Sequence, residues 1–237
     1  MVAHLASLPS AEVGVIFATI RSDSAALNEL VAKYPGRISI IKLDATDKSS
    51  IEKAAAEVEH QLNGKGLDVL INNAGKMGFS PAGIKTMNDL EDHFITNVVS
   101  VQLVTQAFIS LLEKGKGKKI ANISSTFGTI GKAQQFIASP APAYKISKAA
   151  LNALTVQWAL QYEKAGFVIF PISPGWLKTD LGGGDIADLP VEVGAKATLD
   201  KILGAGKEQN GKFLNIHVKG WENNAGVNSY DGLGFPW

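Results

Sequence analysis

The sequence of 237 residues contains no cysteine, which excludes a disulfide framework and thiolate chemistry. Its four histidines are scattered without the spacing of a metal site, so we expect no bound metal. The formal net charge is only +1, which argues against nucleic acid or an anionic membrane surface as a partner. No apolar run approaches the roughly 20 residues of a membrane span, and no secretory signal is evident. These absences predict a cytoplasmic protein without a membrane segment.

Glycine is scarce at the beginning of the chain, although the whole sequence contains 24 glycines. Before Pro35 the only glycine is Gly14, which lies inside a predicted strand. A glycine-rich loop between a strand and a helix is the usual cradle for the pyrophosphate of a dinucleotide. This part of the sequence therefore cannot supply such a cradle.

Apolar segments rich in β-branched residues alternate with longer amphipathic segments along the chain. This alternation predicts a parallel sheet with helices on both faces: one doubly wound, Rossmann-like α/β domain over residues 1–237. The predicted strands are 13–20, 38–43, 67–72, 119–124, 168–173 and 212–216, of which 67–72 reads as buried on both faces. The predicted helices are 22–34, 46–61, 90–112, 142–165 and 191–203.

Polar and small residues gather directly after the predicted strands. In doubly wound sheets, ligands bind outside the carboxyl ends of the strands, where these residues would meet. The pattern therefore predicts an elongated ligand lying across one edge of the sheet. The residues concerned are Arg21, Asp44, Asn72, Asn73, Ala74, Gly75, Ser124, Ser125, Pro174 and Gly175.

Tyr144 and Lys148 stand four positions apart in a predicted helix, so they share one face. A neighbouring ammonium group favours the phenolate and would lower the pKa of the tyrosine. A tyrosine tuned in this way can exchange a proton with a substrate oxygen, and a nearby serine hydroxyl could orient that oxygen. Such a pair also arises by chance on solvated helices, so its weight comes from the rest of the chain.

In these motifs the chain resembles the short-chain dehydrogenase/reductase family over residues 13–237. The matching pieces occur in the family's order, and within the family they are most similar to carbonyl reductases of the C-factor and sniffer type and to fungal norsolorinic-acid ketoreductases. They are Asp44, Asn-Asn-Ala-Gly at 72–75, Asn97, Asn-Ile-Ser-Ser at 122–125, Tyr144 with Lys148, and Ser-Pro-Gly-Trp-Leu-Lys-Thr-Asp at 173–180.

The resemblance implies hydride transfer between a nicotinamide cofactor and a carbonyl or alcohol carbon, in a ketoreductase of secondary metabolism. Tyr144 would be the general acid/base, and Lys148 would tune it and bind the nicotinamide ribose. Ser125 would hold the substrate carbonyl, with Ser124 as the alternative. Asn97 would lie at a kink in its helix and anchor a water relay behind Lys148.

The resemblance also implies a set of cofactor contacts. Asp44 would contact the adenine, and Pro174, Gly175 and Thr179 would shape the nicotinamide site. The backbone of Asn73, Ala74 and Gly75 would approach the adenosine ribose. Arg21 falls where the family selects its cofactor, and an arginine there can hold the extra phosphate of NADP, so NADP(H) is favoured over NAD(H). A solvated arginine beside a helix start is the alternative interpretation of Arg21.

The family's opening strand and its Thr-Gly-x-x-x-Gly-x-Gly loop are missing. Residues 1–8 resemble instead the end of the helix that would follow the loop, terminating at Pro9. Because the missing strand is central in the family, its loss predicts two unpaired strand edges, on 13–20 and on 67–72. Two interpretations are open: an N-terminally truncated form of a longer dehydrogenase, or a shortened form that has lost cofactor binding and acts as a scaffold or partner subunit.

Three further features bear on substrate and assembly. The interval between Ser125 and Tyr144 is long, and Phe136 and Ile137 within it predict either an apolar lid or a neutral surface insertion. The aromatic end of the chain would close over the pocket or pack at a subunit interface. Surplus apolar residues in 90–112 and 142–165, among them Val101 and Val104, predict a homodimer or homotetramer.

Overall fold

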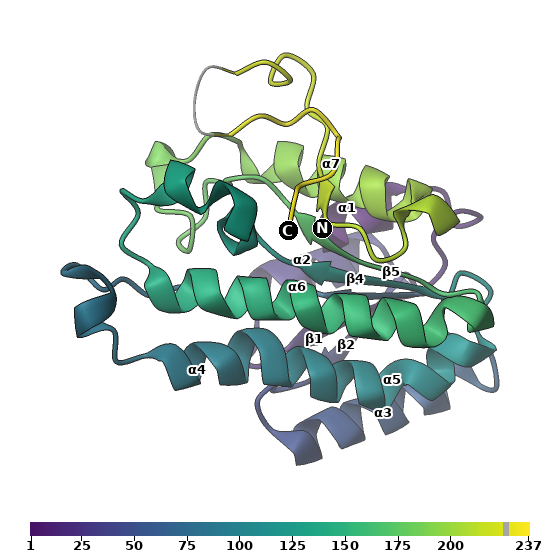
Figure 1. Ribbon diagram of the computed structural model, residues 1–237. Coiled ribbons are helices and arrows are strands. Elements are labelled where there is room, and N and C mark those ends of the chain that lie inside the picture. The colour runs from purple at the N-terminus through teal and green to yellow at the C-terminus, as the bar shows by residue number, and fades with distance from the viewer. Residues whose placement is uncertain (225–227) are drawn as a thin grey trace.

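The computed structural model describes residues 1–224 and 228–237 and confirms a single Rossmann-like α/β domain with parallel strands (Figure 1). The strands are β1 (Ile16–Ile20), β2 (Ile38–Lys42), β3 (Val69–Asn72), β4 (Lys119–Ile123), β5 (Val168–Ser173) and β6 (Leu214–Asn215). The α-helices are α1 (Val2–Ser7), α2 (Ala25–Lys33), α3 (Lys48–Leu62), α4 (Leu90–Phe94), α5 (Ser100–Lys114), α6 (Pro142–Tyr162) and α7 (Val191–Gly204).

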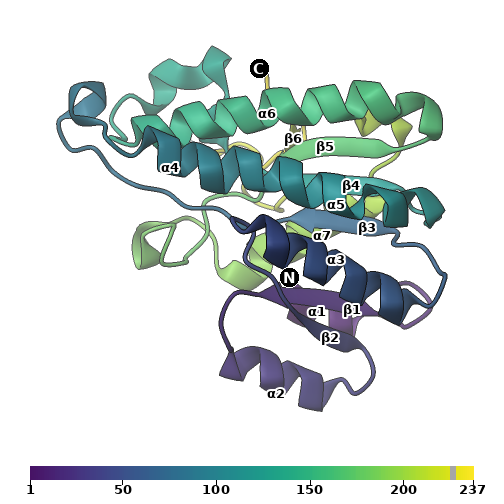
Figure 2. The same cartoon turned by 90° about the horizontal axis from the view of Figure 1, so that it is seen from below.

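The strands form two separate sheets. One contains only β1 and β2, and the other has the order β3-β4-β5-β6. Figure 2 shows β1 and β3 as neighbours on the two facing edges, and no described residue pairs with either strand on that side. The expected pair of unpaired edges is therefore confirmed, and the expected helix near the start is present as α1.

The exposure of β3 differs from the prediction, which was burial on both faces. Val69, Leu70 and Ile71 are only partly buried, whereas every residue of β5 is buried. The difference follows from the sheet order, because β5 lies between two strands and β3 has a partner on one side only. The apolar composition of 67–72 indicates a central strand, but its second neighbour is missing from the described chain.

Three clusters of buried side chains hold the domain together. The largest packs α3, α5 and α6 against one face of the larger sheet, including Leu112, Ile120 and Ile169. The second lies on the side of α7. The third is small and joins α1 and α2 to the two-stranded sheet through Ala6, Ile16, Ala18, Leu27 and Ile38.

Helix boundaries follow local capping. α2 begins at Ala25, later than the predicted residue 22, because Ser24 accepts the capping hydrogen bond from the amide of Leu27. Asp23 instead binds Lys42 at 2.5 Å. Asp47 caps α3, where its carboxylate accepts a hydrogen bond from the amide of Ser49.

The long helical segment Leu90–Lys114 is apolar enough, by length and composition, to cross a membrane, with a mean hydropathy of 1.6. The prediction that no run approached this limit was therefore too strict. The buried side of this segment packs into the core and includes polar residues such as Asn97 and Thr105, which is typical of a core helix. Val101 and Val104 belong to this buried side, so they are not surplus residues available for an interface.

The lysine-rich turn between α5 and β4 is fixed by Asp68. One oxygen of the Asp68 carboxylate accepts hydrogen bonds from the amides of Lys116 and Gly117, both at 2.8 Å. Gly115 is required there, because a Cβ atom at this position would lie 1.9 Å from the carbonyl oxygen of Leu67. The turn is thus exposed but has a defined backbone.

Candidate active site

The carboxyl ends of the parallel strands meet at one edge of the molecule, on the left in Figures 1 and 2. Asn73 and Gly75 follow β3, Ser125 follows β4, and Pro174 follows β5. The strand ends that the sequence singled out on the larger sheet therefore come together, as the predicted topology requires.

Tyr144 and Lys148 lie on the first turns of α6, and both side chains are buried. The Lys148 ammonium lies 5.6 Å from the centre of the Tyr144 ring and donates a hydrogen bond to the carbonyl of Ile123 at 2.7 Å. The Ser125 side chain is close enough to Tyr144 for a hydrogen bond between them to affect the tyrosine pKa. Residues from α6 and from the end of β4 thus form one polar cluster.

The two serines after β4 have different surroundings. Ser124 is buried, and its hydroxyl donates to the side-chain oxygen of Asn152 at 2.6 Å. Ser125 is half-buried, and its hydroxyl accepts only from the nearby amide of Phe127 in addition to its interaction with Tyr144. This geometry favours Ser125 over Ser124 as the residue that faces a substrate.

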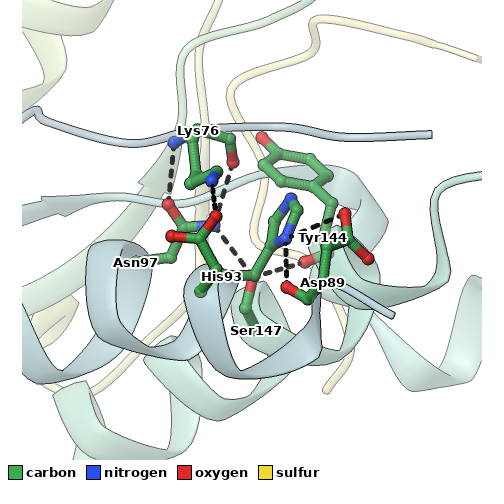
Figure 3. Close-up of polar contacts among 7 residues, drawn as sticks. Lys76, Asp89, His93, Asn97, Tyr144 and Ser147 are labelled. Atoms are coloured by element: carbon green, nitrogen blue, oxygen red, sulfur yellow. Dashed lines mark hydrogen bonds and ion pairs between the residues drawn. The ribbon is translucent and has the colours of Figure 1, made fainter. Parts of the chain in front are cut away.

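Asn97 lies in a π-helical turn, Ile95–Val99, that interrupts the helical segment between α4 and α5. Its side-chain oxygen accepts from the amide of Lys76 at 2.9 Å, and its amide donates to the carbonyl of Lys76 at 3.0 Å (Figure 3). The predicted irregularity of the helix at Asn97 is therefore present, and π-turns are frequent at functional sites.

Ser147 is a residue that the sequence analysis missed. Its hydroxyl accepts a hydrogen bond from the Asn97 side chain at 2.9 Å and donates to the carbonyl of Tyr144 at 2.8 Å (Figure 3). Ser147 thus couples the π-helical turn to the backbone of the tyrosine. Its position three residues after Tyr144, on the same helix face, was the available signal.

The pKa values of the central pair do not follow the prediction. Burial raises the pKa of Tyr144 to about 12, and the hydrogen bond with Ser125 only partly opposes this rise. Burial also lowers the pKa of Lys148 to about 8. The expected lowering of the tyrosine pKa by Lys148 was therefore wrong for the protein alone, because removal from water dominates at both groups.

The predicted cofactor residues on the larger sheet form an open shelf after β3. Asn73, Ala74 and Gly75 are all exposed. A Cβ atom at Gly75 would lie 3.3 Å from the side-chain oxygen of Asn97 and 3.5 Å from the Lys148 ammonium. Glycine therefore leaves space directly above the polar cluster.

The turn after β5 is also specified by glycine. Gly175 has a φ of +86°, and a Cβ atom there would meet Ile216, Leu189 and Tyr230 at 3.0 to 3.2 Å. Thr179 lies further along the same loop, where its hydroxyl accepts from the amide of Gly182 at 3.0 Å. Gly175 thus packs against the cluster of buried side chains on the side of α7, at the end of the strand that pairs with β4, whereas Thr179 stabilises the loop that follows.

Arg21 and Asp44 follow the strands of the smaller sheet. The pKa of Asp44 is lowered, first by hydrogen bonds from Thr46 and also by the charge of Arg21. Arg21 thus acts on the carboxylate through its charge, from the end of the strand that pairs with β2. Arg21 itself is exposed and available to a ligand phosphate.

These residues fit a nicotinamide cofactor in part. The open shelf at Gly75, with Lys148 and Asn97 beneath it, suits the ribose and nicotinamide, and Arg21 suits a phosphate on the adenosine ribose. The described residues contain no glycine-rich loop between the two sheets that could hold the pyrophosphate. A nicotinamide cofactor would therefore find candidate partners at its two ends and, among the described residues, no glycine-rich loop for its pyrophosphate.

A chain of buried amides and hydroxyls lies beneath the site. The Asn72 amide donates to Thr105 at 3.2 Å and to Asn122 at 2.8 Å, and the Asn122 amide donates to Thr155 at 2.8 Å. These bonds tie β3 and β4 to α5 and α6. The sequence signal was an asparagine inside each of two otherwise apolar strands.

His93 and Asp89 were not predicted as parts of the site. His93 is fully buried, and its Nδ1 lies 2.8 Å from the carbonyl and 3.3 Å from the carboxylate of Asp89 (Figure 3). Among the described residues, His93 Nε2 has no hydrogen-bond partner. Both side chains flank Gly78, where a Cβ atom would lie 2.5 Å from the Asp89 carboxylate. The pair therefore packs against the loop that follows the exposed shelf.

The segment between Ser125 and Tyr144 folds into two short 3₁₀ helices, Thr126–Gly128 and Ile130–Phe136. Phe136 is buried and packs on Phe127, with ring centres 4.9 Å apart, whereas Ile137 is exposed. The Phe127 ring also meets the edge of the Tyr144 ring at 6.1 Å. The predicted apolar segment thus lies directly against the tyrosine, with Phe127 as an unpredicted link.

The aromatic end of the chain packs back on the domain. Trp237 accepts a hydrogen bond from the amide of Gly131 at 2.9 Å, and Pro236 accepts one from the Thr129 hydroxyl. Earlier in this segment, the Tyr230 hydroxyl accepts from the amide of Trp176 at 3.1 Å. The last residues therefore hold the loops after β4 and β5, and residues 225–227, also within this end, lie outside the described chain.

No group of His, Cys, Asp and Glu side chains that could hold a metal ion is found among the described residues.

Sequence comparison finds relatives of matching architecture. The family model for short chain dehydrogenases matches residues 5–189. An uncharacterised oxidoreductase of Schizosaccharomyces pombe is 36% identical over 169 residues, which cover 70% of this chain and 64% of that protein. The C-signal protein of Myxococcus xanthus is 32% identical over 172 residues, which cover 72% of this chain and 93% of that protein.

Two solved structures of carbonyl reductases superpose on the whole chain. NADPH-bound carbonyl reductase from chicken fatty liver has a TM-score of 0.85 at 31% identity, covering 100% of this chain and 92% of that one. Carbonyl reductase Sniffer of Drosophila melanogaster has a TM-score of 0.83 at 30% identity, covering 100% and 93%. With the strand-end motifs in place and the family profile matched over residues 5–189, the chain belongs to the short-chain dehydrogenase family of oxidoreductases.

Proposed function

We propose that this chain is an NADP(H)-dependent oxidoreductase that interconverts a carbonyl compound and an alcohol, with Tyr144 as the general acid/base. The observation that carries the proposal is the convergence of Ser125, Tyr144 and Lys148 at the carboxyl end of β4. When bound, the nicotinamide cofactor supplies or accepts the hydride. A role in secondary metabolism remains a prediction.

The residues of the chain have separate tasks in this proposal. Ser125 orients the substrate oxygen, and Tyr144 gives it a proton or takes one from it. Because the pKa of Tyr144 is about 12, the hydroxyl is protonated at neutral pH and is ready to act as an acid. Lys148 holds the ribose side of the cofactor near Gly75. Asn97 acts behind it, where its side chain positions the Lys76 backbone and Ser147.

NADP(H) is preferred because Arg21 is exposed next to Asp44, at the end of β1. A planar guanidinium binds a phosphate through paired hydrogen bonds, whereas NAD offers a hydroxyl at that place. The chicken carbonyl reductase is NADPH-bound, and a dehydrogenase/reductase from Burkholderia multivorans has bound NADP, which supports the same choice.

The split sheet favours a second candidate function. Without a glycine loop among the described residues, the chain could act as a catalytically silent scaffold or partner subunit. Homo-oligomer formation is proposed for either function, through the outer sides of the helical segments 90–114 and 142–162, where Ile95 and Val99 are exposed. A cytoplasmic location also remains a prediction.

Titration of the purified chain with NADPH and NADH, followed by nicotinamide fluorescence, tests the proposal. We expect both to bind, and NADPH to bind more tightly, because only NADPH carries the phosphate that Arg21 can hold. Absence of binding to a folded chain would contradict the proposed activity and favour the scaffold.

A further inference from the structure

Large apolar side chains are exposed on three segments that surround the candidate active site. The three segments follow β3, β4 and β5, so all of them leave the carboxyl edge of the larger sheet. In monomeric proteins, such clusters mark binding surfaces more often than chance exposure. The side chains are Phe79, Ile84, Ile130, Ile137, Trp176, Leu181 and Ile186, with exposed fractions from 37% for Trp176 to 74% for Ile130.

The first two segments form one wall. The amide of Ser80 donates to the carbonyl of Pro140 at 2.7 Å, which fixes Phe79 beside the part of the chain that carries Ile137. The loop after β5, which carries the exposed Trp176 and Ile186, forms the second wall. Both views show all three segments at the same end of the molecule (Figures 1 and 2).

The walls are held in place by specific bonds. The Trp176 ring nitrogen donates to the carbonyl of Gly182 at 2.7 Å, and the Tyr230 hydroxyl donates to Asp188 at 2.5 Å. On the same loop Lys178 and Asp185 form an ion pair at 3.7 Å, so these two opposite charges offset each other beside the apolar side chains. The exposed side chains are therefore displayed by a fixed loop.

Aromatic contacts link the segment that carries Ile137 to the reacting group. The Phe127 ring contacts both Tyr144, at 6.1 Å, and Phe136, at 4.9 Å, and Phe136 directly precedes Ile137. A molecule whose oxygen lies at Tyr144 would therefore extend over aromatic and aliphatic side chains. A small polar carbonyl compound would leave them in water.

We propose that the substrate is a carbonyl compound or alcohol with a bulky apolar body that lies between the two walls; this inference rests on the proposed reductase function. The polar end of the substrate is held by Ser125 and Tyr144. The body covers Phe79 and Ile137 on one side and Trp176 on the other, and its length sets the selectivity.

Steady-state kinetics with NADPH and the series from butan-2-one to nonan-2-one test the inference. Burial of each methylene contributes a factor of about 3 to 4, so kcat/KM should rise steeply along the series until the walls are filled. Calorimetric titration of the chain with nonan-2-one, without turnover, measures the same contact independently of the reaction.

Two variants test whether the exposed apolar side chains near the candidate active site contact the substrate. Ile137→Ser should lower kcat/KM for nonan-2-one about tenfold or more, and it should leave butan-2-one almost unchanged. Leu160→Ser is the matched control, because it removes an equally large exposed side chain (63%) from the far end of α6. It should change neither value.

The outcomes separate the inference from the proposed function. Equal kcat/KM for all the ketones, or equal effects of the two variants, would overturn the inference of an apolar substrate. Either result would leave the proposed reductase function intact. Calorimetric binding of nonan-2-one that Ile137→Ser weakens, without reduction of any ketone, would support the apolar site and overturn the reductase. Binding of phosphatidylcholine vesicles that Ile137→Ser abolishes, together with a flat ketone series, would assign the surface to a membrane and overturn the inference.

Discussion

The two sheets of the molecule differ in stability and in task. The four-stranded sheet is covered by two large clusters, and its central strands β4 and β5 are almost completely buried. The two-stranded sheet has a cluster of only five buried residues and an unpaired edge. Yet the smaller sheet carries Arg21 and Asp44, which we assign to cofactor selection, while the larger one carries the acid/base residues.

This division implies that chemistry and cofactor choice can be disturbed separately. A two-stranded sheet is marginally stable alone. The small sheet depends on α1, α2 and α3, because Ile41 of β2 belongs to the large cluster around α3 and α5. We therefore expect perturbations of the small sheet to affect affinity, and perturbations of the large sheet to affect turnover.

Hydrogen exchange should give the largest difference between the sheets. Ile16 and Ile20 bond to β2, so the alternation of a parallel ladder directs the groups of Phe17 toward the unpaired edge. The Phe17 amide should exchange faster than that of Ile120 in β4 by a factor on the order of 10⁴. Ile16, in the same strand, is the internal control, and Phe17 exchange as slow as that of Ile120 would show that the edge is covered.

Replacement of Tyr144 should remove the acid/base chemistry assigned to the large sheet and leave cofactor binding intact. Tyr144→Phe removes the proton donor and should lower kcat by a factor on the order of 10³, with NADPH affinity retained. Tyr162→Phe, at the other end of α6, should keep full activity. Turnover by Tyr144→Phe at the normal rate would contradict the assigned role.

Burial of Lys148 in the large-sheet part of the molecule should make the free energy of unfolding depend on pH. Its pKa falls from 10.5 to about 8 on folding, so the unfolded state binds more protons between these values and stability rises with pH there. Tyr144 has the opposite effect between pH 10 and about 12, because its pKa rises on folding. Lys148→Met should remove the largest part of the rise and gain up to about 3 kcal/mol at pH 7, measured by urea unfolding; burial also lowers the pKa of Lys119 and Lys145, which leaves a smaller rise. An undiminished rise in Lys148→Met, as expected in the Lys114→Met control, would assign it to these other groups.

Arg21 tests whether the small sheet selects the cofactor. Arg21→Ala should weaken NADPH binding about tenfold, through loss of a charge-assisted hydrogen bond, and should leave NADH binding and kcat unchanged. Equilibrium titration with both cofactors measures the effect, with NADH as the control. An equal loss for the two cofactors would show that Arg21 supports the sheet and does not read the phosphate.

The smallest expected effect is that of Tyr230→Phe, which removes the hydroxyl bonded to Asp188 and to the amide of Trp176. The free energy of unfolding should fall by about 1 kcal/mol, and KM should rise several-fold at constant kcat, because the loop after β5 loses a support. Unchanged KM would separate this loop from substrate binding.

Much of the fold was predictable because parallel strands and their following turns leave strong local patterns. Strand β5 was placed to the residue, and the irregular helix at Asn97 was expected from the family resemblance. The exposure of β3 could not be predicted from its own residues, since it depends on a neighbouring strand. The pKa values of Tyr144 and Lys148 likewise depend on burial by distant segments, which spacing along a helix does not reveal.

Side chains that act on the backbone were the hardest to predict. Ser147 and His93 contact main-chain carbonyls of their own helical segments, at Tyr144 and Asp89, and such contacts leave no periodicity in the sequence. The interval after Ser125 was recognised as unusual, but only the structure separates buried Phe136 from exposed Ile137.

The Asp68 turn has a consequence for limited proteolysis. The sequence at 114–119 offers trypsin four lysines in an exposed connection. Trypsin needs an extended, deformable substrate, whereas two backbone hydrogen bonds to the Asp68 carboxylate and the close approach of Gly115 to Leu67 keep this backbone curved. The most basic stretch of the chain should therefore resist digestion while the domain stays folded, and cleavage there would report opening of the connection between α5 and β4.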